Sequence, residues 1–495
     1  MSFLQGTVIN KHEKLLITAF IVAKILLLIQ LPLFGDEAYF LSWGKDLSLG
    51  YYDHPPMVGW TIHLLNIISE NHYFHRFFAF LTSIVISLFI YLITRNATNK
   101  ESAFLTALIF FVSPASLITV LLTNDVVLVL FGVTGFYVFS QALLKNSLLL
   151  AVAAGVFFGL TFLSKYFSVL MFIGIAIYLI KYRSTINYKV VLVTTLVFLL
   201  FALENLYFNI NNCWNNILFN LVARTRDSDS NTLNPLYYLL SLLFFIPPYA
   251  IYHLKVIRKK SIPNTLIHAL YIATAFLACL LAVSFFKKIG LHWLLLCLPF
   301  IYLLFSLFQT KQQKHLLKYN AYLSIIIAIP LISAFSFQST LFKNNKDLMF
   351  YSDTQTICDL LPANETIFTL GYSANSVLSY ACKNNRFHVI GNTSKYGRED
   401  DKHIDFSDLD GKNIWIFATN KDASDGVATY FSNTETSRLA VSDEVDFYLV
   451  RTEGFNFKKY KSKILSVINQ RFYTRPFWLP EAQCNFKTKY GLRRL

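Results

Sequence analysis

The sequence predicts a polytopic α-helical membrane protein with a mixed α/β domain at its C-terminal end. Of the 495 residues, 55% are hydrophobic and only 15% are charged, whereas soluble domains carry about 25% charged residues. Apolar runs long enough to cross a bilayer recur from residue 15 to residue 337. After residue 338, polar residues become frequent and short β-rich runs replace the long apolar ones.

The apolar runs predict about eleven membrane spans. The first, 15–34, follows Lys11 and Lys14 and lacks the small-residue cleavage site of a secretory signal, so we expect a retained anchor. A further interfacial helix is expected over 56–69. The other expected spans are 73–95, 102–122, 124–143, 147–164, 166–181, 188–210, 233–254, 264–285, 290–309 and 317–337.

The segment 338–495 is expected to form a separate domain, after a transmembrane domain over 1–337. Its length, about 150 residues, suits a single domain. Short runs rich in β-branched and aromatic residues alternate there with turn residues, which favours a mixed α/β fold. The expected strands are Thr366–Leu370, Phe387–Ile390, Asn413–Ala418 and Val445–Val450.

The distribution of charge predicts the orientation of the chain in the membrane. Fifteen of the 23 Lys and Arg before residue 338 lie in segments on the same side as the N-terminus. Because cytoplasmic loops carry an excess of Lys and Arg, that side is expected to be cytoplasmic. An odd number of spans then places the C-terminal domain outside, with most acids of the membrane part, Asp227 and Asp229 among them. The net charge of +15 therefore requires no nucleic-acid partner.

The six cysteines form neither a disulfide framework nor a CxxC metal motif. Cys279 and Cys297 lie in apolar runs and are expected to be small buried hydrophobes. A disulfide between Cys358 and Cys382 is possible if the C-terminal domain faces an oxidising compartment.

The first outer loop, 35–72, holds the residues that most strongly suggest chemistry. Asp36 and Glu37 directly follow a span, and acids at a membrane boundary are costly and commonly functional. They could instead stabilise the first turn of a helix beginning at Ala38. Asp53 and His54 precede two prolines that would fix an extended segment, although a local hydrogen-bonded turn is an alternative.

Basic residues lie on the same predicted face. Arg76 opens a span and Lys165 lies between two spans, where a cation with apolar flanks suits a phosphate. Lys287 and Lys288 could equally extend toward the membrane surface. Asp125 begins another span, where a helix cap explains it nearly as well as a site does. These residues suggest a lipid-phosphate-linked substrate, with a carboxylate that deprotonates an acceptor hydroxyl.

Several segments resemble glycosyltransferase family 39, the bacterial relatives of protein O-mannosyltransferases and lipid A aminoarabinose transferases. The resemblance covers most of residues 30 to 310. Its most specific part is the Asp-His-Pro-Pro string within the first outer loop. The matching segments are Gly35–Tyr39, Gly50–Pro56, His75–Phe77, Thr123–Asp125, Gly159–Tyr166 and His292-Trp293 followed by Pro299.

The resemblance implies a C-type glycosyltransferase (GT-C) fold in the bacterial inner membrane. It implies transfer of a sugar, with inversion, from a polyprenyl-phosphate donor to an envelope acceptor: lipid A, another glycolipid or polysaccharide, or protein. Asp36 matches the general base and Glu37 its neighbour, and no metal or cofactor is expected. The remaining implied substrate-binding residues are Arg76 and Lys165 for the lipid phosphate, Asp53, His54 and Asp125, and His292 and Trp293, whose indole could stack on a sugar.

A transporter or flippase for lipid-linked sugars is the alternative function. Such a protein needs polar groups along a path through the membrane, often in repeated halves. Here most acids lie at one face and no internal repeat is visible. Lys24, within the first span, and Glu204, in a later one, are costly placements that the sequence does not explain.

Overall fold

The computed structural model describes residues 8–224, 231–255, 262–336 and 344–492. The chain folds as two units, each built from three separate segments. Unit 1 contains Met1–Gln30, Ile68–Leu203 and Ser228–Ile332, and unit 2 contains Leu31–Ile67, Glu204–Asp227 and Ser333–Leu495. The predicted domain boundary at 337/338 lies outside the described residues, as do Asp227 and Asp229. Unlike the predicted domains, the units are discontinuous in sequence, and residues 35–67 of the first outer loop belong to unit 2.

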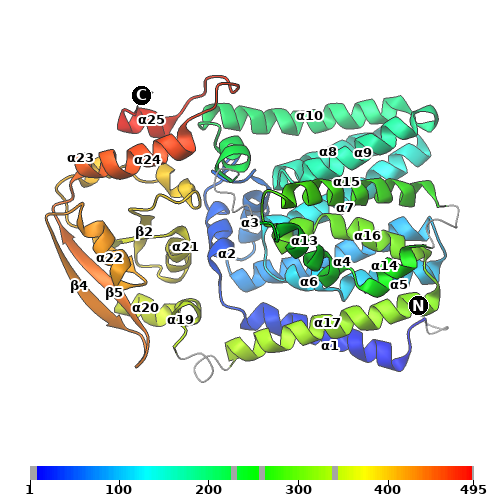
Figure 1. Cartoon of the computed structure of the whole chain (residues 1–495), viewed down its shortest axis with the longest axis horizontal. Coiled ribbons are helices and arrows are strands. Elements are labelled where there is room, and N and C mark those ends of the chain that lie inside the picture. Colours follow the sequence, from blue (N-terminus) through cyan, green and yellow to red (C-terminus); the bar gives the residue numbers. More distant parts are fainter. Residues whose placement is uncertain (1–7, 225–230, 256–261, 337–343, 493–495) are drawn as a thin grey trace. The chain divides into compact units, whose positions relative to one another are not determined.

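Unit 1 is helical (Figure 1). Its elements are α1 (Lys11–Gln30), α4 (His72–Arg95), α5 (Lys100–Phe111), α6 (Pro114–Ile118), α7 (Asn124–Lys145), α8 (Leu148–Ser164), α9 (Ser168–Lys181), η1 (Arg183–Thr185), α10 (Tyr188–Asn211, whose last residues are counted in unit 2), α13 (Asn234–Phe245), α14 (Pro248–His253), α15 (Asn264–Ser284), η4 (Leu291–Leu294), α16 (Cys297–Leu304), η5 (Phe305–Leu307) and α17 (Thr310–Ser336).

Every predicted span contains a helix, but several helices are shorter than expected. Among the described residues, α4, α7, α10, α15 and α17 are long and apolar enough to cross a membrane, and α1 joins them if it is counted together with the helix that follows it. Two predicted spans are broken: 102–122 at Ser113-Pro114 and 233–254 at Pro247-Pro248. Proline lacks the N–H that continues a helix, which explains both breaks.

Lys24 of α1 hydrogen-bonds to α4 and to α6, the short helix that follows the break. Its ammonium is fully buried and donates to the Ser83 hydroxyl and to both the carbonyl and the hydroxyl of Ser116. The Ser116 carbonyl lies in a helix of only five residues, whose carbonyl groups lack regular helical partners. The lysine that the sequence left unexplained therefore satisfies backbone and hydroxyl oxygens at a broken span.

Unit 2 combines short helices with a five-stranded sheet. Its elements are α2 (Gly35–Trp43), α3 (Met57–Asn66), α11 (Asn215–Ile217), η2 (Leu218–Ala223), α19 (Lys346–Ser352), α20 (Thr354–Leu360), β1 (Thr366–Thr369), α21 (Tyr372–Ala381), β2 (Arg386–Val389), η6 (Arg398–Lys402), η7 (Phe406–Leu409), β3 (Trp415–Ala418), α22 (Lys421–Ala428), β4 (Asn433–Ala440), β5 (Asp446–Glu453), α23 (Phe457–Tyr460), η8 (Lys461–Leu465), α24 (Ser466–Ile468), η9 (Asn469–Tyr473) and α25 (Asn485–Tyr490). The expected interfacial helix over 56–69 is α3.

The strand order is β2-β1-β3-β5-β4, with β2, β1 and β3 parallel and the last two pairings antiparallel. The four predicted strands correspond to β1, β2, β3 and β5, so the mixed α/β prediction for this region is confirmed. Strand β4 was missed because most of its residues are polar and exposed, as suits an edge strand. Its sequence therefore lacks the apolar alternation by which a strand is recognised.

Two disulfides link parts of unit 2. Cys358 and Cys382 are joined, as the sequence allowed, by a bond between α20 and the end of α21. The second bond joins Cys213 to Cys484 across 271 residues. No sequence pattern indicates this second bond, because nothing local connects the two positions.

Candidate functional site

Asp36 lies in the first turn of α2, and α21 of the same unit positions it. Gly35 approaches α21 so closely that a Cβ atom there would lie 2.5 Å from the Cβ of Ser373. This approach lets the Tyr372 hydroxyl donate a hydrogen bond of 2.6 Å to Oδ1 of Asp36. Helices α2 and α21 are thus held together at the residue that the resemblance assigns as the base.

Asp36 and Glu37 have opposite surroundings although they are adjacent. Successive residues point about 100° apart around a helix. Asp36 is exposed, whereas Glu37 is buried with 1% of its surface accessible. Of this predicted pair, only Asp36 therefore presents its carboxylate at the surface.

The segment that carries Asp53 and His54 is fixed by two asparagines from residues 204–227. The Asn216 amide donates to the carbonyl oxygens of Tyr51, Tyr52 and His54. The Asn220 amide donates to the Asp53 carbonyl oxygen at 3.0 Å. These long-range bonds hold the segment's backbone in addition to the two prolines that follow it.

Asp53 shares its surroundings with a second acid, Glu399. Burial and the negative charge of Glu399 raise the pKa of Asp53 to about 7. Glu399 accepts hydrogen bonds from the Tyr52 N–H and, at 2.6 Å, from the Lys402 ammonium. Asp53 itself accepts a longer hydrogen bond, of 3.5 Å, from the Tyr39 hydroxyl.

His54 lies in an aromatic pocket of unit 2. Its ring centroid is 6.2–6.3 Å from those of Phe40, Trp43 and Phe219, and 9% of its surface is exposed. This packing favours a role in shaping the loop.

Asp125 and Lys165 form an ion pair in unit 1. The Lys165 ammonium lies 2.8 and 2.9 Å from the two carboxylate oxygens of Asp125, and both side chains are buried. A buried ammonium requires such a partner, and the pair accounts for both residues that the sequence placed at adjoining span ends.

Aromatic rings extend this pair into a cation–aromatic cluster, formed by Lys165, Phe167, Lys287 and Trp293. Lys165 lies 5.5 Å from the Phe167 ring, and Phe167 lies 4.7 Å from Trp293. Lys287 lies 6.0 Å from the Trp293 ring. The structure thus brings two of the predicted cations and the predicted tryptophan together, while the neighbouring His292 is exposed.

Arg76, in α4, is fully buried. Its guanidinium donates to the Leu28 carbonyl oxygen at 3.1 Å.

The part of the chain that the structure describes contains no group of three His, Cys, Asp or Glu side chains arranged to hold a metal ion.

We call Asp36, Asp53 and Glu399 the acidic group of unit 2. Four residues of this group and its surroundings were not predicted from the sequence: Asn216, Asn220, Tyr372 and Glu399. Each lies at least 160 residues from its partner in the first loop. The run Arg398–Lys402, rich in charge, is visible in the sequence as an unusual feature. Nothing in it indicates that it meets the first loop, because that requires the fold of the whole unit.

Known proteins resemble this chain in part of its sequence and in its fold. A family model described as dolichyl-phosphate-mannose-protein mannosyltransferase matches residues 53–208. The lipid A galacturonosyltransferase RgtD of Rhizobium johnstonii is 28% identical over 183 residues, which are 36% of this chain. The apo structure of ArnT from Cupriavidus metallidurans matches with a TM-score of 0.65 at 12% identity, over 89% of this chain and 98% of that one. The chain has the GT-C fold of these structures and resembles these glycosyltransferases in part of its sequence. The predicted fold class and the predicted resemblance are thereby confirmed.

The matched regions differ in extent. The alignment with RgtD covers 39% of the length of RgtD, so this chain matches less than half of that protein. A second ArnT structure, bound to undecaprenyl phosphate, aligns over 88% of this chain and 97% of that one, with a TM-score of 0.62 and 11% identity. The family match at 53–208 includes five predicted site residues, Asp53, His54, Arg76, Asp125 and Lys165. Asp36, Glu37, His292 and Trp293 lie outside it.

Proposed function

We propose that this protein is an integral-membrane glycosyltransferase that moves a sugar from a polyprenyl-phosphate donor to an envelope acceptor on the extracytoplasmic face. Its kinship to a family of glycosyltransferases and to RgtD, a lipid A galacturonosyltransferase, supports this class of reaction. The ArnT structure with undecaprenyl phosphate supports the class of donor. The name of RgtD supports a glycolipid such as lipid A as the acceptor, whereas the description of the family model supports a protein.

The observation that carries the proposal is the exposed Asp36 carboxylate, oriented by the Tyr372 hydroxyl. In the proposed reaction the acceptor oxygen forms a bond to the anomeric carbon, and the bond from that carbon to the phosphate oxygen breaks. The configuration at the anomeric carbon inverts, because attack and departure occur on opposite faces. The acceptor proton passes to Asp36, and the electron pair leaves with polyprenyl phosphate.

The cation–aromatic cluster and Arg76 are the proposed phosphate-binding groups. A leaving phosphate gains negative charge as its bond to the sugar breaks, and a nearby ammonium stabilises that charge. Asp125 would then hold Lys165 in position between turnovers. Trp293 offers an aromatic face near this cation, which suits a sugar ring.

The two disulfides support the extracytoplasmic placement of unit 2. Disulfides persist in oxidising compartments and are rare in the bacterial cytoplasm. Both are in the unit that contains Asp36, whereas the free cysteines, Cys279 and Cys297, belong to unit 1.

The first experiment identifies the sugar and the acceptor, by mass spectrometry of envelope glycolipids and glycoproteins from cells with and without this chain. The second reconstitutes the protein with that donor and acceptor. We expect Asp36→Asn to lower transfer by a factor of about 100 to 10,000 because the base is lost. Asp46→Asn, which changes an exposed acid ten residues away, is the matched control and should leave transfer within about twofold.

Two outcomes would contradict different parts of the proposal. Normal transfer by a well-folded Asp36→Asn protein would remove the base assignment and point to a phosphate acceptor, which has no proton to lose. If the protein moves the lipid-linked sugar across the bilayer without transferring it, the alternative function of a transporter would be favoured over that of an enzyme.

A further inference from the structure

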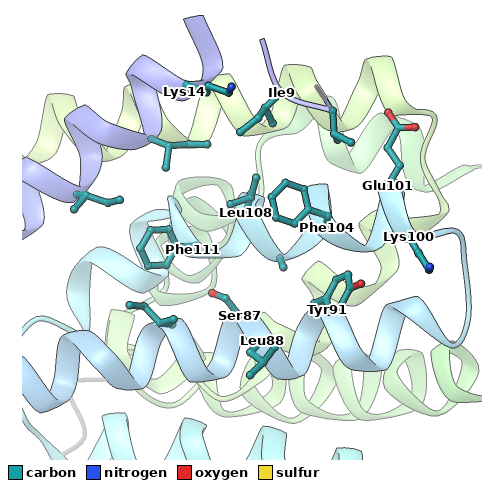
Figure 2. A pocket seen from close by; sticks show the side chains of 15 residues that line it. Ile9, Lys14, Ser87, Leu88, Tyr91, Lys100, Glu101, Phe104, Leu108 and Phe111 are labelled. Atoms are coloured by element: carbon teal, nitrogen blue, oxygen red, sulfur yellow. The ribbon is translucent and has the colours of Figure 1, made fainter. Parts of the chain in front are cut away.

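A cavity of about 890 Å³ lies within unit 1 among α1, α4 and α5, and the proposed reaction does not use it. Figure 2 shows Phe104, Leu108 and Phe111 of α5 directed toward this cavity, with Lys14 and Lys100 at its edge. We call it the α1–α4–α5 groove.

The walls of the groove are mostly apolar and partly open. Ile17 and Ile21 of α1 lie along one side. Ile84, Leu88 and Phe104 line the groove with 43%, 52% and 40% of their surfaces exposed. In a membrane protein such side chains face hydrocarbon, so the groove is open to lipid.

The groove has the depth of one bilayer leaflet. Its lining on α5 runs from Lys100 to Phe111, a rise of about 16 Å at 1.5 Å per residue. The hydrocarbon core of a bilayer is about 30 Å thick, so half of it is about 15 Å. Phe111, which is buried, is the last residue of α5 and closes the deep end two residues before the break at Ser113.

The open end of the groove is positively charged. Lys14 lies in the first turn of α1 and Lys100 begins α5, and both are exposed. Arg95, in the last turn of α4, lies 6.0 Å from the ring of Tyr91, which lines the groove. Among the residues that line this end, Lys14 and Lys100 outnumber the one carboxylate, Glu101, where a lipid headgroup would lie.

The groove is separate from the groups proposed to bind the donor phosphate. Arg76 and Arg95 lie near opposite ends of α4, nineteen residues apart along the helix. That separation is about 29 Å, close to the full thickness of the hydrocarbon core. The groove therefore opens toward the leaflet opposite to the one that Arg76 faces.

We propose that the α1–α4–α5 groove binds an anionic phospholipid, with one acyl chain between the three helices and the headgroup phosphate on Lys14 and Lys100. The positive charge at the rim favours an anionic lipid over a zwitterionic lipid, because the ammonium group of a zwitterionic lipid offsets the charge of its phosphate. Juxtamembrane cations contribute to anionic lipid binding in this way.

Native mass spectrometry of the full chain in detergent tests the site, with phosphatidylglycerol and phosphatidylcholine of identical acyl chains as probes. We expect the first phosphatidylglycerol to bind at least about tenfold more tightly than the first phosphatidylcholine. Lys14→Gln and Lys100→Gln should each weaken phosphatidylglycerol binding by about fivefold, the effect of one cation near a headgroup, and leave phosphatidylcholine unchanged. Lys145→Gln, an exposed lysine at the end of α7, is the control and should change neither.

A second pair of variants tests the acyl chain. Ile84→Trp should weaken both lipids by filling the groove, whereas Leu149→Trp, at an 80% exposed position of α8, should not. Equal binding of the two phospholipids would overturn the proposal, because the groove would then take any lipid. The groove would instead bind the donor lipid if undecaprenyl phosphate binds tightly, Lys14→Gln weakens that binding, and phosphatidylglycerol does not bind tightly. A dimer lost in Ile84→Trp, without bound lipid, would make it an interface between copies.

Discussion

At the scale of single residues, the acids of the first loop have different states although they lie close in sequence. Asp36 is exposed and accepts a hydroxyl hydrogen bond, as a base does before reaction. Asp53 is buried beside Glu399 and has its pKa raised to about 7. Acids whose surroundings differ in this way commonly divide their roles at a site. Asp53 is therefore suited to holding the loop as a neutral or half-protonated group, whereas Asp36 is suited to receiving the proton.

The raised pKa of Asp53 predicts a pH dependence of stability. The ordinary pKa is 3.8, so between about pH 4 and pH 7 the folded protein binds this proton more tightly than the unfolded chain does. The contribution of Asp53 is thus most favourable below pH 4 and falls as the pH rises to 7, by about 4 kcal/mol over three pH units. Asp53→Asn should remove this part of the dependence. Melting temperatures of the purified protein at pH 4.5 and 7.5 measure it: the wild type should lose several degrees more than the variant, and Asp46→Asn should behave as wild type. An unchanged dependence in Asp53→Asn would contradict the buried acid pair.

The pairing of Lys165 with Asp125 predicts that the effect of losing Lys165 on stability can be separated from its effect on sugar transfer. Lys165→Ala leaves a buried carboxylate without its ammonium, which costs about 3–5 kcal/mol. Replacing both residues, as in Lys165→Met with Asp125→Leu, removes both charges and should restore most of that stability. If Lys165 binds the donor phosphate, the double variant should remain folded and still fail to transfer sugar. Thermal unfolding and transfer assays on the single and double variants test this together, and a double variant that is stable and active would exclude a phosphate-binding role for Lys165.

At the scale of elements, hydropathy predicted where helices occur better than where they end. The apolar runs located every long helix of unit 1, because burial in lipid requires about twenty apolar residues in sequence. The breaks at Ser113-Pro114 and Pro247-Pro248 carry a local proline signal that a count of apolar residues ignores. Strand β4 carries no such signal, since an exposed edge strand needs no apolar face. Elements with a local sequence signal, such as a long apolar run, were therefore predictable. An element such as β4, which forms because it pairs with a neighbouring strand, was not.

The contact of α2 with α21 gives a prediction at this scale. In Gly35→Ala the new Cβ would lie 2.5–2.9 Å from three atoms of Ser373, one of them its Cα. Because backbone cannot easily yield, α2 should shift and the bond from Tyr372 to Asp36 should lengthen. We expect transfer to fall by at least about tenfold, with a loss of about 1–3 kcal/mol in stability from overpacking. Gly426→Ala, where a Cβ meets open space, is the matched control. Adding Ser373→Gly, which removes two of the three atoms, should recover part of the activity, and no recovery would indicate that α2 is positioned by other contacts.

At the scale of the whole molecule, the acidic group is assembled from three distant parts of the chain. The first loop supplies Asp36 and Asp53, residues 204–227 supply Asn216, and the C-terminal segment supplies Tyr372 and Glu399. The sequence predicted the acids of the first loop because charge beside a span is locally unusual. It could not predict their partners, which depend on three segments folding into one unit. The same reason explains why Cys213 and Cys484 were not paired from the sequence.

The arrangement of cysteines predicts which compartment unit 2 occupies. Four of the six cysteines form the two disulfides, all in unit 2, and Cys279 and Cys297 are free. If unit 2 lies in an oxidising compartment, protein denatured without reductant should react with a mass-tagged maleimide at two thiols, and at six after reduction. Cys213→Ser should raise the unreduced number to three by releasing Cys484, whereas Cys213→Ser with Cys484→Ser should return it to two. Since the Cys213–Cys484 bond closes a long loop, either variant should also lose about 2–5 kcal/mol of stability. Six reactive thiols in unreduced wild-type protein would place unit 2, and with it Asp36, on the cytoplasmic side.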